Sequence, residues 1–171
     1  VVDKDVEAAL DAGVDMVHVF ASTSDVQIED SMHSTREDVK QRSIEAVERV
    51  VESGTTVMYS PMDATRTDED YLIEMIEAVT DVGVDWINIP DTCGVATPTR
   101  FGDLIEVVDA HTTAKIDVHT HDDFGLATAN ALSGIESGAD QAQVSVNSIG
   151  ERAGNAAYEE FVMAVESLYQ T

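Results

Sequence analysis

The hydrophobic positions of this chain form short apolar runs that alternate with longer amphipathic stretches. Several amphipathic stretches end in glycine, which closes a helix easily because it accepts the left-handed conformation. An apolar run then follows within a few residues. These runs are rich in β-branched residues and have the length of buried parallel strands. They are MVHVF (16–20), TVMYS (56–60), WINI (86–89), KIDVHTH (115–121) and AQVSV (142–146).

The stretches between the runs carry the signals of helix starts. Residues 34–37 and 67–70 have the Ser/Thr-x-x-acid spacing of capping boxes, and Thr97 precedes a proline that suits the first helical position. Residues 70–79 show the apolar stripe of an amphipathic helix, and a last helix is expected near 155–168. Strict alternation of helices and strands predicts a parallel sheet, in either a doubly wound fold or a (β/α)8 barrel. A complete barrel needs roughly 250 residues, more than the 171 present.

The chain is strongly acidic. It has 34 acidic and 9 basic residues and a formal net charge of −25, with the acids spread along the helical stretches. Such a shell repels itself unless counter-ions screen it, and in molar salt the screening length falls to about 3 Å. We therefore expect a halophilic source with high salt inside the cell. The same charge opposes binding to nucleic acid or to anionic membranes.

Cysteine and hydropathy add two further expectations. Cys93 is the single cysteine, which excludes an intrachain disulfide, and we expect it to be a small buried residue and not a nucleophile. The sequence contains no signal-peptide pattern and no apolar run of 18 residues. A soluble, cytoplasmic protein is expected.

Two histidines end the fourth predicted strand, where parallel βα folds gather their functional side chains. His119 and His121 are two residues apart, so both side chains leave the same face of the strand. Two imidazoles there can bind one divalent cation, with Asp122 and Asp123 placed to orient them. Two ligands do not complete a site, so a pair of ordinary hydrogen-bonded histidines is the alternative.

Other strand ends carry less specific signals. Arg66 follows the second strand and is either a clamp for a carboxylate or phosphate, or a surface partner of a nearby aspartate. His18, in the first strand, is by itself more typical of a core residue than of a ligand. The loop 150–154 is either a backbone cradle for an anion or a glycine-rich connector, and Asn155 is expected to open the last helix.

Read in order, the strand ends resemble a known family, that of the 2-isopropylmalate, homocitrate and citramalate synthases of the DRE-TIM metallolyase superfamily. The resemblance covers essentially the whole chain, and its HxH-D-D/N-x-G and GERxGN motifs are the specific ones. The matching segments are VHVFASTS (17–24), YSPMDATRTD (59–68), INIPDTCGVATP (87–98), VHTHDDFGLATANA (118–131) and NSIGERAGNAAYEE (147–160).

The resemblance implies an α/β fold, part of a TIM (β/α)8 barrel comprising about strands three to seven with their helices. Residues 1–171 are then expected to form a single incomplete catalytic domain. The first two strands, the last strand and any accessory C-terminal region would lie outside it. For the full-length protein we expect a homodimer.

The resemblance also implies roles for individual residues. His119, His121 and Asn155 match ligands of a divalent cation, which could be zinc, manganese or magnesium. The remaining ligand of the family, an aspartate beside a catalytic arginine, belongs to a strand before residue 1. Thr92 matches a threonine that holds the 2-oxo acid carboxylate, and His18 matches the pocket wall formed by the third strand. Arg66 is a further candidate for substrate binding.

The implied reaction is a Claisen-type condensation of acetyl-CoA with a 2-oxo acid, in leucine or related amino-acid biosynthesis. Met62 departs from the family, which commonly has a glutamate there, so the catalytic residues stay open. The isolated 171-residue chain is expected to be inactive. A metal- or oxo-acid-binding paralogue without catalysis is one alternative. A retro-aldol lyase of the same superfamily is another, disfavoured because the SIGERAG loop lacks the cysteine that lyases use.

Overall fold

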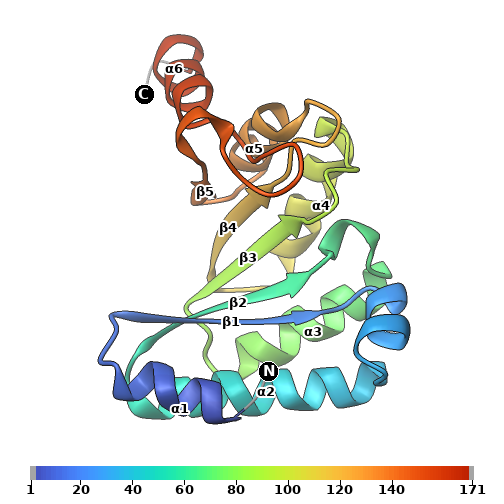
Figure 1. Ribbon diagram of the computed structural model, residues 1–171, viewed down its shortest axis with the longest axis vertical. Helices are drawn as coiled ribbons and strands as arrows, with labels where there is room; N and C mark the ends of the chain where they lie inside the picture. Colours follow the sequence, from blue (N-terminus) through green and yellow to red (C-terminus); the bar gives the residue numbers. More distant parts are fainter. Residues whose placement is uncertain (1–2, 170–171) are drawn as a thin grey trace.

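The computed structural model describes residues 3–169. The strands of this part form one five-stranded parallel sheet with the order β1-β2-β3-β4-β5 (Figure 1). The strands are β1 (Met16–Ser22), β2 (Thr56–Met62), β3 (Trp86–Asp91), β4 (Lys115–Thr120) and β5 (Gln141–Gln143). The α-helices are α1 (Asp3–Asp11), α2 (Arg36–Ser53), α3 (Glu69–Asp81), α4 (Pro98–Ala110), α5 (Ala127–Glu136) and α6 (Tyr158–Leu168). The predicted alternating α/β array with a parallel sheet is confirmed. Three short turns, η1 (Gln27–Ser31), η2 (Ala64–Arg66) and η3 (Val146–Ser148), follow strands β1, β2 and β5.

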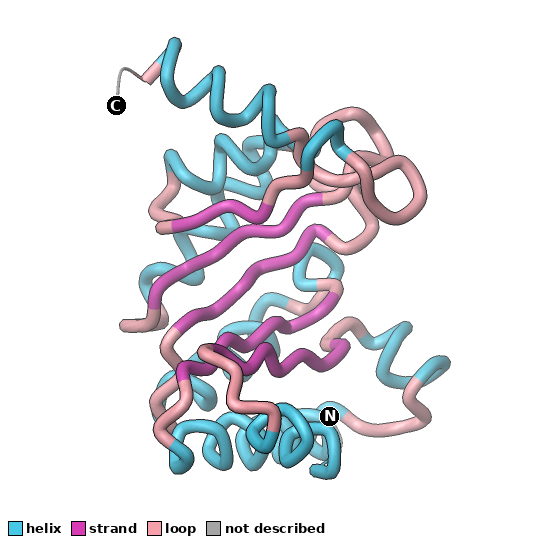
Figure 2. Tube along the Cα trace, turned by 60° about the vertical axis from the view of Figure 1, so that its left-hand side comes forward, coloured by secondary structure: helices cyan, strands magenta, loops and turns pink. Residues whose placement is uncertain are grey.

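The sheet has one face covered by helices and one face that carries polar side chains. In β1, Val17 and Val19 are buried against the helical layer, whereas His18 and Phe20, on the other face, are exposed. Figure 2 shows the strands as one continuous curved sheet, and Figure 1 shows α2 and α3 beneath β1 and β2. The main core therefore lies between the sheet and its helices, and the opposite face is left for the site.

Both helix starts predicted from capping boxes are displaced by one residue. Thr35 caps α2 by accepting from the Asp38 N–H at 3.1 Å, and Asp68 caps α3 by accepting from the Tyr71 N–H at 3.2 Å. Thr67 does not cap α3 because its hydroxyl donates to the carbonyl of Asp63. Pro98 does open α4, as predicted, with Thr97 before it.

The C-terminal part differs most from the prediction. β5 ends at Gln143, three residues earlier than expected, and Val146 lies in the turn η3. α6 begins at Tyr158, so Asn155 does not open it but lies in the preceding loop. No residue of α6 is buried, although Phe161 packs against the small cluster of Ala127, Ala131 and Ala156. Within residues 3–169, no helix is both long and apolar enough to cross a membrane.

Candidate metal centre and substrate cavity

His119 and His121 meet at the carboxyl end of β4. Their side chains leave the same face, as the two-residue spacing predicts, and their Nε2 atoms lie 3.1 Å apart. Burial lowers the pKa of both imidazoles, and each histidine has a nearby cation or imidazole that lowers its pKa further. Both rings are therefore neutral at physiological pH, which is the form that binds metals.

Asn155 lies beside the two histidines although it follows His119 by 36 residues in the sequence. Its amide Nδ2 lies 3.3 Å from Nε2 of His119 and 3.4 Å from the carbonyl of Thr120. The loop before it folds back on β4, since the Ala156 N–H donates to Thr120 and the Asp122 N–H donates to Gly154. The predicted ligand triad is thus brought together, although Asn155 stands in a loop and not at a helix start.

Two glycines make this close approach possible. A Cβ on Gly150 would lie 1.8 Å from Oδ1 of Asn155, and a Cβ on Gly154 would lie 2.0 Å from the carbonyl of Ser148. Gly154 also has φ +110°, a conformation that other residues rarely adopt. The glycines at these positions therefore serve the placement of Asn155.

Asp122 and Asp123 have partners other than the histidines that they were expected to orient. Asp122 Oδ1 accepts from the Ala127 N–H at 3.0 Å, at the start of α5. Asp123 forms a bidentate ion pair with Arg152, with both contacts at 2.7 Å. The group that does contact an imidazole is Gln143, whose Oε1 lies 2.9 Å from Nδ1 of His119.

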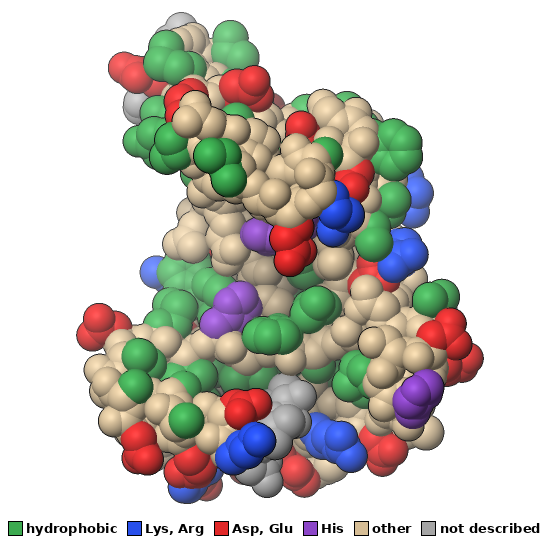
Figure 3. Space-filling model, in the orientation of Figure 1, with side chains coloured by type: hydrophobic (Ala, Val, Ile, Leu, Met, Phe, Trp, Pro, Cys, Tyr) green, Lys and Arg blue, Asp and Glu red, His purple; other side chains and the backbone are tan. Residues whose placement is uncertain are grey.

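A cavity of about 310 Å³ opens on the polar face of the sheet beside the histidines. Figure 3 shows histidine and hydrophobic side chains in the hollowed middle of this side of the molecule. Thr92, His18 and Met62 all line the cavity, and Arg66 is not among its lining residues. The other lining residues are Phe20, Ser60, Asn88, Pro90, His119, His121, Gln143 and Glu151.

Thr92 is held so that its hydroxyl proton remains available. The hydroxyl oxygen accepts from the Asp63 N–H at 2.8 Å, and the Thr92 carbonyl accepts from Arg152 at 2.7 Å. An oxygen that accepts from the backbone can still donate its own proton into the cavity.

Arg66 lies apart from this cavity and forms a bidentate pair with Asp63, at 2.8 and 2.6 Å. Asp63 is fully buried and takes the left-handed conformation, which directs its carboxylate toward the arginine. The sequence had left two roles open for Arg66, a clamp for a ligand or a partner of an aspartate, and the structure shows the second. Cys93, near the same pair, is half-buried, and burial raises the pKa of its thiol.

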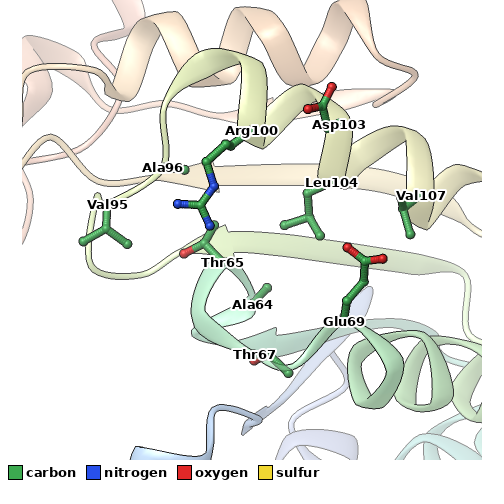
Figure 4. A pocket seen from close by; sticks show the side chains of 10 residues that line it. All are labelled: Ala64, Thr65, Thr67, Glu69, Val95, Ala96, Arg100, Asp103, Leu104 and Val107. Carbon is green, nitrogen blue, oxygen red and sulfur yellow. The ribbon is translucent and has the colours of Figure 1, made fainter.

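A second cavity of about 270 Å³ lies outside the sheet, between η2, the start of α3 and α4 (Figure 4). Arg100 extends toward Thr65 there, and the carboxylates of Glu69 and Asp103 belong to the same lining. None of the predicted site residues lines this cavity. Its mixed charge gives no preference for an anionic ligand.

The structure adds polar residues that the sequence interpretation missed. Ser60, Asn88 and Asp117 are buried on the polar face, and Gln143 lies beside them. One signal was present in the sequence, since Asp117 is two residues before His119 and shares its face. Burial raises the pKa of Asp117 to about 6.

The donors that meet at β4 fit a divalent cation. Two neutral imidazole nitrogens face one another, and Nδ1 of His121 is buried without a partner. The Asn155 amide lies beside them; its oxygen is the atom that can ligate a cation, whereas its Nδ2 donates toward His119. Among residues 3–169, no cluster of three or more His, Cys, Asp and Glu side chains is arranged around a metal position. The set found here is therefore two imidazoles and one amide.

Known proteins resemble this chain over nearly its whole length. A family model described as HMGL-like matches residues 1–170. The chain is 52% identical over 166 residues to a probable 2-isopropylmalate synthase from Ignicoccus hospitalis, and 48% identical over 166 residues to a 2-isopropylmalate synthase from Sulfurisphaera tokodaii. Each match covers 96% of this chain but only 42% and 43%, respectively, of the relative. The chain thus spans about two fifths of the length of these curated relatives.

Solved structures share the fold at low identity. An HMG-CoA lyase from Bacillus subtilis superposes with a TM-score of 0.86 at 22% identity, covering 96% of this chain and 60% of the lyase. The carboxyl transferase domain of Rhizobium etli pyruvate carboxylase gives a TM-score of 0.71 at 20% identity, covering 95% of this chain and 26% of that one. These likenesses confirm the fold as part of a (β/α)8 barrel.

Proposed function

Because this chain belongs to the HMGL-like family within the DRE-TIM metallolyases, we propose that it forms part of an acyltransferase that condenses acetyl-CoA with a 2-oxo acid. The observation that carries the proposal is the meeting of His119, His121 and Asn155 beside a cavity that Thr92 also lines. Relatives named 2-isopropylmalate synthase, at 43–52% identity, favour synthesis over cleavage. Leucine biosynthesis is the corresponding pathway in this proposal.

We propose that His119, His121 and Asn155 hold a divalent cation, zinc, manganese or magnesium. Such a cation supplies Lewis acidity to the keto oxygen and carboxylate of the 2-oxo acid. The protein's part is to keep both imidazoles neutral, which burial achieves by lowering the pKa of each ring. The family's fourth ligand, an aspartate, has no counterpart assigned among residues 3–169.

Thr92 is proposed to orient the substrate. Its oxygen is held by the Asp63 N–H, so the free proton of the hydroxyl can be donated to a substrate carboxylate in the cavity. The carbonyl of Thr92 is fixed by Arg152, which is itself fixed by Asp123. Arg152 thereby ties the Thr92 loop to the loop that carries Asn155.

Phe20, Met62 and Pro90 supply the apolar part of the cavity. Met62 offers neither a titratable proton nor a strong acceptor, so no proton transfer is assigned to this position. We propose that the base that removes the proton from acetyl-CoA lies outside the described residues. We accordingly propose that the 171-residue chain alone does not turn over acetyl-CoA.

The experiment is a thiol-release assay with acetyl-CoA and several 2-oxo acids, performed on the complete polypeptide that carries this sequence. Release of CoA that requires a 2-oxo acid and a divalent cation is expected. Pyruvate, 2-oxoisovalerate and 2-oxoglutarate are compared in parallel, because their side chains differ in size and charge. The Gln41→Leu variant, altered at an exposed position of α2, is the matched control.

Met62 also supports a second candidate, a paralogue that binds a cation or an oxo acid without catalysis. Stoichiometric cation binding with no CoA release from any 2-oxo acid would favour this candidate. Cleavage of a hydroxyacyl-CoA without condensation would instead identify a lyase. Neither cation binding nor condensation would exclude the proposed function altogether.

A further inference from the structure

A line of hydrogen bonds crosses the polar face of the sheet and joins all five strands. It runs from His18 in β1 through Ser60, Asn88, Asp117 and Gln143, and it returns to His119 in β4. Asp117 stands in the middle of the line and is fully buried. Its Oδ2 is 2.7 Å from Nδ2 of Asn88 and 2.5 Å from Nε2 of Gln143.

Asp117 determines which atoms donate and which accept along this line of hydrogen bonds. Its Oδ2 accepts from both amides, so each amide must turn its N–H toward Asp117 and its oxygen away. This holds for the carboxylate and also for an acid that carries its proton on Oδ1, the atom that has no hydrogen-bond partner. The orientation of Asn88 and of Gln143 therefore follows from Asp117 alone.

The arm toward β1 fixes the proton of His18. Asn88 Oδ1 accepts the single hydroxyl proton of Ser60 at 2.8 Å. The Ser60 oxygen, 2.6 Å from Nε2 of His18, must then act as an acceptor in that contact. His18 consequently carries its proton on Nε2.

The arm toward β5 fixes the proton of His119 in the opposite way. Gln143 Oε1 can only accept, so the contact of 2.9 Å requires a proton on Nδ1 of His119. The Nε2 atom of His119 then carries a lone pair and can only accept. That atom is the one that lies 3.1 Å from His121 and 3.3 Å from Asn155.

We propose that Asp117, Asn88 and Gln143 are positioning residues that fix His18 and His119 in opposite tautomers, with His18 protonated on Nε2 and His119 on Nδ1. For His119 the consequence rests on the proposed function, because an Nε2 lone pair is what a cation requires. Free neutral imidazole favours the Nε2–H form, which would block that ligand atom. Gln143 removes this preference.

The test reads both tautomers by NMR in the metal-free protein. Histidine is labelled with ¹⁵N, and each resonance is assigned by replacing one histidine at a time. Nitrogen shifts and two-bond couplings distinguish a protonated from an unprotonated ring nitrogen. Wild-type protein is expected to show Nδ1–H at His119 and Nε2–H at His18. The opposite tautomer at His119 would overturn the inference without the need for any variant.

Two variants separate the arms and serve as controls for one another. Gln143→Leu should move His119 toward Nε2–H and leave His18 unchanged. Asn88→Leu frees the Ser60 hydroxyl proton to turn toward His18, so His18 should gain the Nδ1–H form while His119 stays unchanged. Gln41→Leu, at an exposed glutamine that donates to Glu45 of its own helix, should change neither histidine. A Gln143→Leu protein that keeps the wild-type tautomer at His119 contradicts the role of Gln143.

Cation affinity provides the functional measurement. Loss of a partner that orients a ligand costs about 10–100-fold in affinity, and this is the loss expected for Zn²⁺ binding by Gln143→Leu. Gln41→Leu should bind Zn²⁺ as the wild type does, and unchanged affinity in Gln143→Leu would contradict a positioning role. Because the tautomers are measured without metal, absence of any cation site would leave that result standing and would refute only the proposed function.

Discussion

Replacing Gly150 by alanine tests how Asn155 is held. A methyl carbon at Gly150 would lie 1.8 Å from Oδ1 of Asn155, whereas ordinary contact begins at about 3.4 Å. The two groups must separate by about 1.6 Å, which is the difference between these distances. Metal ligands tolerate deviations of only about 0.2 Å. Asn155 would therefore leave the site, while His119 and His121 would stay.

Isothermal titration with Zn²⁺ or Mn²⁺ measures this effect. Gly150→Ala is expected to weaken binding at least about tenfold, or about 1.4 kcal/mol. Gly125→Ala is the matched control, since it adds a methyl group in the loop after β4 where no atom lies within 4 Å. Gly125 has φ +70°, so its variant also controls for general destabilisation. Wild-type affinity in Gly150→Ala would refute the proposed placement of Asn155.

Three further predictions follow from charge and burial. Burial raises the pKa of Asp117 from 3.8 to about 6, so the folded state holds this proton more tightly, and the group's contribution to stability falls as pH rises through that window. In urea unfolding, Asp117→Asn should accordingly gain about 3 kcal/mol relative to wild type between about pH 4 and pH 8, and a difference that is constant with pH contradicts this. Because the pKa values of His119 and His121 are lowered, cation affinity should persist at neutral pH and fall as the solution is acidified below about pH 6.5. A loss of affinity that begins above neutral pH would be inconsistent with neutral ligands. With a net charge of −25, the melting temperature should rise between about 0.1 M and 1 M KCl, where screening shortens from about 10 to 3 Å, and a temperature insensitive to salt would oppose the halophilic interpretation.

The parts of this fold that repeat a local pattern could be predicted from the sequence. The strands β1 to β4 are short apolar runs between amphipathic stretches, and α3 buries the stripe that its periodicity indicates. β5 and α6 were placed less well, because none of their residues is fully buried and hydrophobicity alone then sets no boundary. Their limits depend instead on Ser145, whose N–H donates to the carbonyl of Ala156 and whose carbonyl accepts from the N–H of Tyr158, the first residue of α6.

In the site, too, the features set by neighbouring residues could be predicted, whereas contacts between residues far apart in the sequence could not. His119 and His121 share a face because of their spacing, which the sequence states directly. The partner of His119 is Gln143, 24 residues away, and only the pairing of β4 with β5 brings the two together. For Arg66 the sequence allowed either a ligand or an aspartate partner. The left-handed backbone of Asp63 placed that carboxylate within reach of the arginine.

We propose that His119 and His121 hold one divalent cation at the carboxyl end of β4. Isothermal titration of the complete, metal-free protein with Zn²⁺ or Mn²⁺ tests it most directly. One tight cation per chain is expected in the wild type, and no tight cation in His119→Ala or in His121→Ala. The exposed His33→Ala variant should bind as the wild type does. Stoichiometric cation retained by both His119→Ala and His121→Ala would contradict the account.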